Sequence, residues 1–284
     1  MQACNPASTP VDPHIHLGKS SAEFEATSEE KKMYQSAVGP VMYAMLGSRP
    51  GIEYTVSRVR QYGMNSNQSH WTAVKRIFRY LVGTPNHGLC YGIKGSGAGC
   101  TETDWDAGAY TKSMGGFSFL LNGAAISWNS KKQATVALSS TESEYMPLKQ
   151  AVKESIWLQT LLLDLRAQKH LLELRSIHID NQAALALAHK PEYHARIKLI
   201  DIQYHFVPQY CENKTITLSY CPTGEITADI FTKVLPQPAF AKHILVLGSI
   251  DKSLQDLQLT AEYGDTTGAT ANTINGSTVE WRCC

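Results

Sequence analysis

The chain has 284 residues, a formal net charge of +1 and 43% hydrophobic residues. This length suffices for one large domain or two small ones, and the hydrophobic share excludes a globally disordered chain. The near-neutral charge excludes a strongly basic nucleic-acid binder, so any contact with nucleic acid must come from local patches. No apolar run reaches the roughly 18 residues of a membrane-spanning helix, and we expect no membrane partner.

The chain starts without the basic-then-apolar pattern of a signal peptide. Its seven cysteines have no spacing that resembles a zinc site, and their odd count and irregular spacing favour reduced thiols. We therefore expect an intracellular protein.

The first 95 residues begin with an extended lead-in and continue as helices. Residues 33–62 are expected to be helical, with interruptions around Gly39-Pro40 and at Arg49-Pro50-Gly51. A second helix is expected from Ser69 to about Val82, because apolar residues recur there at intervals of three to four. Its apolar stripe consists of Trp71, Val74, Phe78 and Leu81.

Three basic residues lie largely off that stripe: Lys75, Arg76 and Arg79. A charged helix face is most often simply solvated, and contact with phosphates is the functional alternative. We keep these three residues as candidates for nucleic-acid binding.

A flexible joint, GSGAG at residues 95–99, suggests a domain boundary, and we divide the chain into 1–95, 96–245 and a tail of little expected order, 246–284. Strand-like segments follow the joint at 100–106, 116–122 and 124–129. The Asn122-Gly123 step between the last two predicts a tight hairpin.

A long helix is expected from about Ser140 to Leu165, with an apolar face of Leu148, Val152, Ile156 and Leu163. A strand (176–180), a helix (183–189), a strand (216–220) and a helix around Asp229 follow. Three strands in a meander can pair antiparallel, whereas the later two must join through helical crossovers. The sequence therefore predicts an α/β fold with a mixed five-stranded sheet and helices on both faces, preceded by a mostly helical segment.

Four acidic residues stand at the ends of these elements: Glu102, Glu144, Asp180 and Asp229. Strand ends and helix starts can converge on one edge of such a sheet, and gathered carboxylates then need divalent cations between them. Two ions about 4 Å apart can activate water and stabilise the leaving oxygen of a phosphodiester. From spacing alone, scattered surface acids remain the simpler interpretation.

Several long blocks resemble the Pol polyprotein of copia-type LTR retrotransposons. The blocks at 125–145, 191–206 and 228–233 are similar to its RNase H domain, and the blocks at 34–54 and 70–88 are similar to the segment that joins polymerase to RNase H. They occur in the order of that family over roughly residues 1–245. The resemblance implies an RNase H-like fold for 96–245 and a C-terminal remnant of reverse transcriptase, connection- or thumb-like, for 1–95.

The resemblance also assigns metal ligands one by one. Glu144, Asp180 and Asp229 match three of the family's acids, and Glu102 falls on the first aspartate of its Asp-Ala-Asp-Trp motif, with Asp104 on the second. These residues would hold two Mg²⁺ or Mn²⁺ ions and hydrolyse the RNA strand of RNA–DNA hybrids. Other partners and places are implied as well: the rest of the Pol polyprotein, and a virus-like particle in the cytoplasm or the nucleus.

The sequence departs from the family in ways that bear on activity. Glu102 replaces an aspartate, and a displacement of about 1 Å can cost on the order of 100-fold in rate. Asp104 shares its strand face, but impairment is the interpretation we favour over substitution. Other departures are a loop at 105–112 that is one residue shorter, Pro147 in place of a helix former, and Leu199 in place of a histidine.

Two functional hypotheses follow from this pattern: an active hybrid nuclease, or a weak or inactive remnant that still binds hybrids. No Tyr-x-Asp-Asp motif occurs, so no DNA synthesis is expected. An integrase is disfavoured for two reasons. Its late aspartate precedes its glutamate, whereas Glu144 precedes Asp180 here, and the chain has no zinc motif. Basic candidates for backbone contact are Lys131, Lys132, Arg196 and Lys198.

Three further residues receive structural interpretations. Trp128 and Trp157 are expected to pack in the core or against helices. His178 lies two residues before Asp180 on the same strand face, where a structural role outweighs a place near metal ions.

Overall fold

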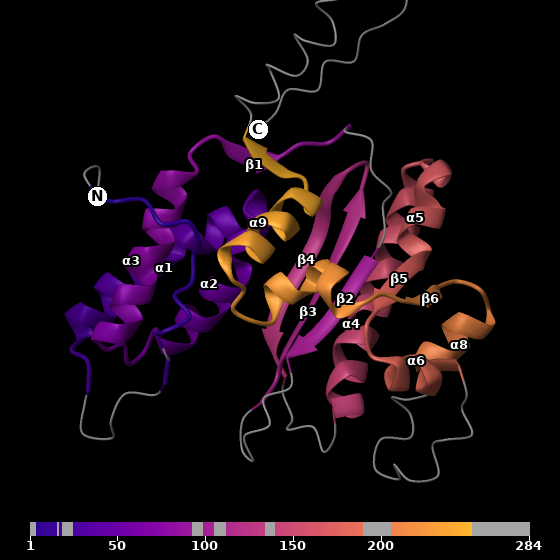
Figure 1. Ribbon diagram of the computed structural model, residues 1–284, viewed down its shortest axis with the longest axis horizontal. Helices are drawn as coiled ribbons and strands as arrows, with labels where there is room; N and C mark the ends of the chain where they lie inside the picture. Colours follow the sequence, from indigo (N-terminus) through magenta and orange to yellow (C-terminus); the bar gives the residue numbers. More distant parts are fainter. Residues whose placement is uncertain are drawn as a thin grey trace, which may run out of the picture.

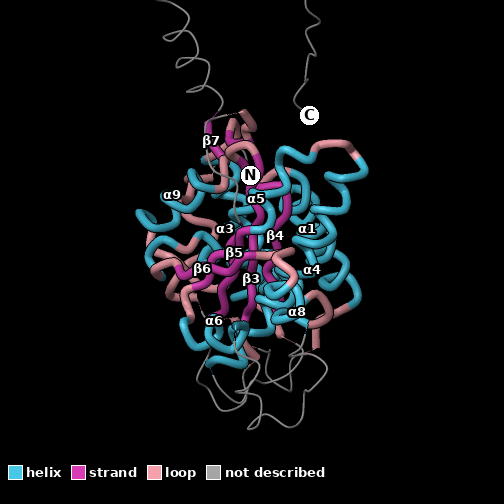
Figure 2. Tube along the Cα trace, turned by 90° about the vertical axis from the view of Figure 1, so that its right-hand side faces the viewer, coloured by secondary structure: helices cyan, strands magenta, loops and turns pink. Residues whose placement is uncertain are grey.

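The computed structural model describes residues 4–15, 17–18, 25–92, 99–104, 112–133, 140–189 and 206–251. A central sheet separates two groups of helices, one formed mainly by the N-terminal part of the chain and the other by its middle (Figure 1). The view turned by 90° shows the strands running through the middle of the molecule, with helices around them (Figure 2).

The first helix, α1 (Ser28–Gly47), begins at a capping box in which Thr27 and Glu30 exchange side-chain to backbone hydrogen bonds. It continues through Pro40, so the interruption predicted at Gly39-Pro40 is wrong. Proline removes one backbone hydrogen bond, but the helix buries a continuous face that compensates for that loss. That face consists of Tyr34, Val38, Val41 and Met45.

The second predicted interruption is confirmed, because the 3₁₀ turn η1 (Pro50–Ile52) separates α1 from the short helix α2 (Glu53–Val59). Another turn, η2 (Arg60–Tyr62), leads to α3 (Gln68–Gly83), whose N-terminus is capped by Asn67.

The buried face of α3 differs from the predicted stripe. Trp71, Phe78 and Leu81 are only partly buried, and the buried residues are His70, Ala73, Val74, Ile77 and Tyr80. The helix turns this face inward because it packs against elements far along the chain: the ring of Tyr80 meets Phe240 edge-on at 5.7 Å. Local periodicity cannot reveal such a partner.

The large sheet has five strands in the order β4-β3-β2-β5-β6. The strands β2, β3 and β4 pair antiparallel. The strand β5 pairs in parallel with β2, and β6 pairs in parallel with β5. Asn122 and Gly123 both have positive φ, which confirms the predicted hairpin turn. The mixed α/β class is likewise confirmed. The strand bounds are β2 Gly99–Asp104, β3 Met114–Leu121, β4 Ala124–Lys132, β5 Ser176–Ile179 and β6 Thr217–Tyr220.

One face of the sheet is covered by α4 (Ser140–Asp164), with α5 (Leu171–Arg175) beside it. The helix α4 continues through a buried Pro147 and packs Tyr145, Leu148 and Val152 on Phe117 and Phe119. The turn η3 (Gln168–His170) and the helices α6 (Gln182–His189) and α8 (Phe206–Glu212) complete this side.

Two predictions about α4 are wrong. Leu163 and Trp157 are exposed, the latter at 58%, while Leu158 and Leu162 are buried instead. Trp128, by contrast, packs as predicted: it is partly buried against the N-terminal core and donates from Nε1 to the carbonyl of Met45 at 3.2 Å.

The other face of the sheet is covered by α1, α2 and α3 together with two late elements, η6 (Thr227–Phe231) and α9 (Gln237–Val246). The helix predicted around Asp229 is therefore only a five-residue 3₁₀ turn, which follows the turn η5 (Thr223–Glu225). Its short length reflects its packing, since Ala228, Ile230 and Phe231 all enter the core.

A second, two-stranded sheet lies at one end of the molecule beside α9 (Figure 1). It pairs β1 (His87–Leu89) with β7 (Ser249–Asp251), and neither strand was expected. Residues 246–251 of the predicted tail are thus part of the fold, and the remainder lies outside the described residues.

Cys4, Cys90, Cys211 and Cys221 are not joined in disulfides, and the side chains of the other three cysteines lie outside the described residues. Among the helices that the structure describes, none has the length and apolar character needed to cross a membrane.

Candidate functional site

A single row of paired residues crosses the sheet at the candidate site. Ser130 of β4 is the register partner of Gly116 in β3, and Gly116 is the partner of Glu102 in β2. The parallel pairing of β2 with β5 matches Cys100 to His178. The strand β5 ends at Ile179, and continuing the same register by two residues sets Glu102 level with Asp180, the residue after the strand. The backbone therefore brings these two predicted acids to the carboxyl ends of neighbouring strands.

The turn η6, which carries Asp229, lies against β2 and β3 on one face of the sheet. The turn η6 lies so close to β3 that a Cβ on Gly116 would be 2.6 Å from the Cβ of Phe231. Asp229 itself is buried and pairs with Lys233, whose Nζ lies 2.7 Å from Oδ1. The glycine is what allows the turn that carries Asp229 to approach the sheet.

Asp180 is held by its neighbours on the parallel side of the sheet. Its Oδ2 accepts a hydrogen bond from the hydroxyl of Thr223 at 2.6 Å. Two residues earlier, Nδ1 of His178 is 2.7 Å from the hydroxyl of Ser219, and burial lowers the pKa of this histidine. This contact joins His178 to the neighbouring strand β6.

Glu144 lies half-buried near the start of α4, on the helix that covers the opposite face of the sheet. The carbonyl of the preceding residue, Ser143, accepts a hydrogen bond from Gln133 at 2.8 Å. Gln133 in turn donates its backbone N–H to the carbonyl of Ser113, which ties the helix start to β3 and β4.

The structure thus relates Glu102, Asp180 and the turn that carries Asp229 through the sheet, whereas Glu144 lies on the helix over the opposite face. Among the described side chains, no three histidine, cysteine or acidic residues lie close enough together to hold a metal ion. Glu102 and Asp104 are placed by their backbone alone, since the description covers only the main chain of β2.

Two of the predicted basic residues, Lys131 and Lys132, are exposed at the end of β4. They line a cavity of about 300 Å³ between the sheet and α4, to which Lys153 also contributes. Gly116 and Pro147 belong to the same lining, so this positively charged cavity begins at the row described above. Arg196 and Lys198 lie outside the described residues.

The basic residues of α3 have another role. Arg76 forms an ion pair with Asp12 at 2.8 Å and donates to the carbonyl of Thr9, and Arg79 donates to the carbonyl of Asn5 at 2.7 Å. Both side chains fasten the N-terminal lead-in to the helix. Lys75 is exposed.

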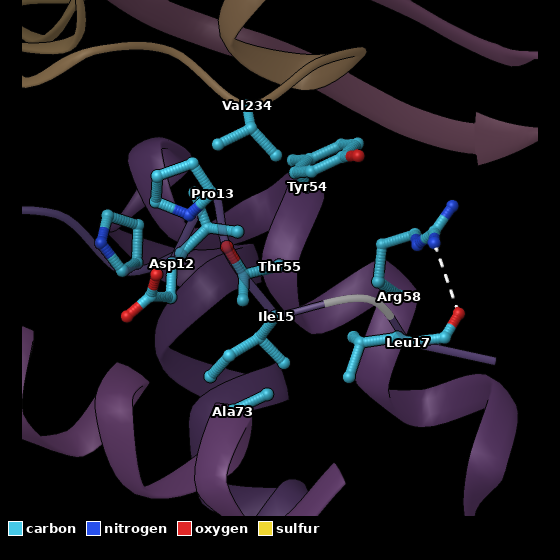
Figure 3. A pocket seen from close by; sticks show the side chains of 11 residues that line it. Asp12, Pro13, Ile15, Leu17, Tyr54, Thr55, Arg58, Ala73 and Val234 are labelled. Atoms are coloured by element: carbon cyan, nitrogen blue, oxygen red, sulfur yellow. Dashed lines mark hydrogen bonds between the residues drawn. The ribbon is translucent and has the colours of Figure 1, made fainter. Parts of the chain in front are cut away.

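A second cavity, of about 190 Å³, lies where the lead-in crosses α2 and α3 (Figure 3). Its walls are largely apolar and include Pro13, Ile15 and Tyr54, while Arg58 donates a hydrogen bond to the carbonyl of Leu17 at its rim. It contains none of the predicted acids and is distinct from the row.

One buried acid was missed by the sequence analysis. Glu53, at the start of α2, is only 5% exposed, and its Oε1 accepts the backbone N–H of Ser130 at 3.2 Å. Burial raises the pKa of Glu53 to about 7, although the hydrogen bond from Ser130 and the charge of Arg60 act in the opposite direction. Nothing in its local sequence distinguishes it from a surface glutamate.

The retrovirus-related Pol polyprotein from transposon TNT 1-94 of Nicotiana tabacum is 39% identical over 248 residues, which are 84% of this chain and 18% of that protein. The corresponding polyprotein from transposon RE2 of Arabidopsis thaliana is 33% identical over 257 residues, covering 88% of the chain and 17% of the relative.

This chain belongs to the family of copia-type retrotransposon Pol polyproteins. It spans less than a fifth of the length of the two polyproteins compared. Any activity of a complete Pol polyprotein is therefore a proposal for this chain.

A shorter relative matches part of the chain. Secreted RxLR effector protein 161 of Plasmopara viticola is 43% identical over 128 residues, which are 90% of that protein but 44% of this chain. No protein-family model matches the chain. No solved structure matches it either.

Proposed function

We propose that this retroelement chain is an RNase H-like nuclease that hydrolyses the RNA strand of RNA–DNA hybrids. In this proposal Glu102, Glu144, Asp180 and Asp229 form the acidic site, with Asp104 beside it, and residues 1–95 are the C-terminal remnant of a reverse transcriptase that makes no DNA. The chain acts as part of a longer Pol polyprotein inside the cell, in a cytoplasmic virus-like particle or the nucleus.

The observation that carries the proposal is the register of the sheet. Extending the parallel register of β2 with β5 by two residues sets Glu102 level with Asp180, and the turn η6, which carries Asp229, packs Phe231 against Gly116, the register partner of Glu102. Three residues that match the family's acids, separated by up to 127 positions in sequence, are thus carried by elements that meet at one row. Scattered surface acids have no reason to do so.

The chemistry of these donors fits hard divalent cations. Carboxylate oxygens are the ligands that Mg²⁺ and Mn²⁺ prefer, and two such ions would supply a nucleophilic water and stabilise the leaving oxygen. Asp229 is buried, and its negative charge is balanced by the ion pair with Lys233. This pairing supports a site at which a positive charge beside Asp229 is favoured. Thr223 fixes the orientation of Asp180 for the same task.

The charged cavity beside the row provides a path for the hybrid's backbone. Lys131, Lys132 and Lys153 line it, and phosphate groups are attracted to such local positive charge even when the net charge is close to zero. We assign Lys131 and Lys132 to backbone contact. Arg76 and Arg79 bind the lead-in with the same side chains, so phosphate contact by these two residues and by Lys75 stays a prediction.

Cleavage of end-labelled duplexes by the full chain tests this function. We expect cuts only in the RNA strand of an RNA–DNA hybrid, in Mg²⁺ or Mn²⁺, with 5′-phosphate and 3′-hydroxyl products, and none in DNA duplexes. Asp229→Asn is the matched control, because it removes the charge while keeping the volume. Equal cleavage by wild type and by this variant would contradict the proposal.

A second candidate function is favoured by Glu102. If the longer side chain misplaces its carboxylate, the chain binds hybrids without cutting them efficiently. Hybrid binding measured by fluorescence anisotropy in Ca²⁺, together with negligible cleavage in Mg²⁺ and Mn²⁺, identifies this alternative.

A further inference from the structure

The strand β4 forms one edge of the five-stranded sheet, yet its free edge is not left open at Ser130. The backbone N–H of Ser130 is accepted by Glu53, at 3.2 Å, and its carbonyl receives the hydroxyl of Ser57 at 2.7 Å. Both partners come from α2, so two side chains one helical turn apart occupy the position that a neighbouring strand would take. The helix therefore fixes both backbone groups of one residue.

The side chain of Ser130 carries this contact onward. Its hydroxyl donates to the carbonyl of Phe231 at 2.5 Å, and Phe231 is the last residue of η6. The same turn rests on Gly116, the register partner of Ser130. All of these groups are buried, so no water competes for the hydrogen bonds. A continuous chain of contacts thus leads from α2 through Ser130 to the turn that carries Asp229.

We propose that Glu53 and Ser57 are positioning residues that set the place of Asp229 at the acidic site by holding Ser130. This inference rests on the function proposed above and adds to it a role for the N-terminal helices. They act on the nuclease site through Ser130. A nuclease domain without them would keep its acids but lose the support of η6.

The identity of the residue at position 53 favours positioning over simple edge protection. Capping the two backbone groups of an edge strand requires only neutral donors and acceptors, as Ser57 shows. A buried carboxyl group is costly, and burial raises its pKa to about 7. Glu53 stands where the helix, the strand edge at Ser130 and η6 meet, and there its burial is offset in part by the hydrogen bond from Ser130.

Hydrogen exchange of the full chain tests the contact without relying on activity. The backbone N–H groups of Thr232 and Lys233 both donate to the carbonyl of Asp229 and report on the turn. We expect Ser57→Ala and Glu53→Ala to speed their exchange about tenfold, the effect of losing one buried hydrogen bond. Glu53→Gln keeps an acceptor for the backbone N–H of Ser130, so Thr232 and Lys233 should exchange at nearly the wild-type rate in this variant.

Ser127→Ala is the matched control for exchange, because Ser127 lies on the same strand but its hydroxyl bonds to Glu154 of α4, on the other face. It should leave Thr232 and Lys233 unchanged. Equal exchange in all variants overturns the proposal, as does a speed-up that Ser127→Ala reproduces. Ser57→Ala covers the case in which Glu53→Ala fails to fold.

The kinetic readout separates positioning from structural support. In hybrid cleavage, Ser57→Ala should lower kcat about tenfold with an unchanged KM for the hybrid, since Asp229 acts after binding. Faster exchange with an unchanged kcat overturns the positioning role. Faster exchange in a chain whose wild type cuts no hybrid supports the contact and overturns the proposed function instead, so the two failures are distinguishable.

Discussion

The two faces of the sheet are built on different plans. The face under α4 is closed by residues 117–218, and its core consists mostly of aliphatic and aromatic side chains from neighbouring elements. The opposite face is closed by residues from both ends of the described chain, Tyr34 to Leu247, and contains the buried acid Glu53 beside Ser57 and Ser130. The core under α4 is built by the middle of the chain, whereas the core on the opposite face joins residues from both ends of the described chain.

This difference shows that the N-terminal helices pack on the sheet and share a core with it. Val56 and Ile77 share one core with Ala125 and Phe231, so the hydrophobic contacts cross the joint at 95–99. The domain boundaries that we drew remain predictions, but the helices before the joint cover the sheet instead of standing apart. The predictions below test the row between the faces first and then each face in turn.

The largest effect is expected at the row itself. Asp180→Asn removes a charge that the proposal gives to the metal ions, and losing several kcal/mol of stabilisation corresponds to about a 1,000-fold lower cleavage rate. Asp164→Asn, at the exposed end of α4, should cut at the wild-type rate. The measurement is single-turnover cleavage of a labelled hybrid, with circular dichroism to verify folding. Comparable loss in both variants would point to a general charge effect.

Truncation of one buried residue on each face tests whether the cores unfold together. Ile77→Ala and Leu148→Ala should each lower the free energy of unfolding by about 3 kcal/mol, because both side chains are fully buried. Since the sheet belongs to both cores, we expect one shared transition in urea, followed by fluorescence and circular dichroism. An early separate transition in Ile77→Ala, with the sheet still folded, would show that the N-terminal helices are independent.

The buried acid makes the second face sensitive to pH. Glu53 has an ordinary pKa of 4.5 when unfolded and about 7 when folded, so folding favours its neutral form. The stability that it contributes is complete below pH 4.5 and is lost as the pH rises through about 7. Glu53→Gln does not titrate, so its free energy of unfolding should rise relative to wild type by on the order of 3 kcal/mol over this range. A difference that is constant with pH would contradict this account.

The smallest effect is expected at the charged cavity under α4. Lys131→Ala and Lys132→Ala together should weaken hybrid binding by about tenfold at low salt and reduce the slope of log affinity against log salt by about 1 to 2. Lys75→Ala, at an exposed position far from the cavity in sequence, is the comparison variant. Anisotropy titrations at several salt concentrations make the measurement. An equal change in slope for Lys75→Ala would remove the special role of the cavity.

The elements with strong local signals were predictable from the sequence. Asn122-Gly123 marked the hairpin, short strand-like segments marked the strands of the large sheet, and the apolar repeat marked α4 with bounds close to those observed. The errors share a cause, namely contacts that are distant in sequence. Pro40 stays helical, α3 turns Ile77 and Tyr80 inward, and η6 is a short turn because each packs against an element from the other end of the chain.

The candidate site was predictable only in part. The acids were found through the resemblance to the family, and the register then related Glu102 to Asp180, which spacing alone does not do. The role of Arg76 could not be foreseen, because its partners Thr9 and Asp12 are 67 and 64 residues away. Glu53 escaped for the same reason: its significance lies in Ser130, 77 residues further along.

Cleavage by wild type and Glu102→Asp, compared on the same RNA–DNA hybrid in Mg²⁺ and in Mn²⁺, tests the central claim most directly. The account predicts that the shorter side chain restores the position of the carboxylate and raises the rate of RNA-strand cleavage by up to about 100-fold. Wild type that is already fast and gains nothing would contradict the impairment at position 102, and a complete lack of hybrid cleavage in both proteins would contradict the proposed nuclease.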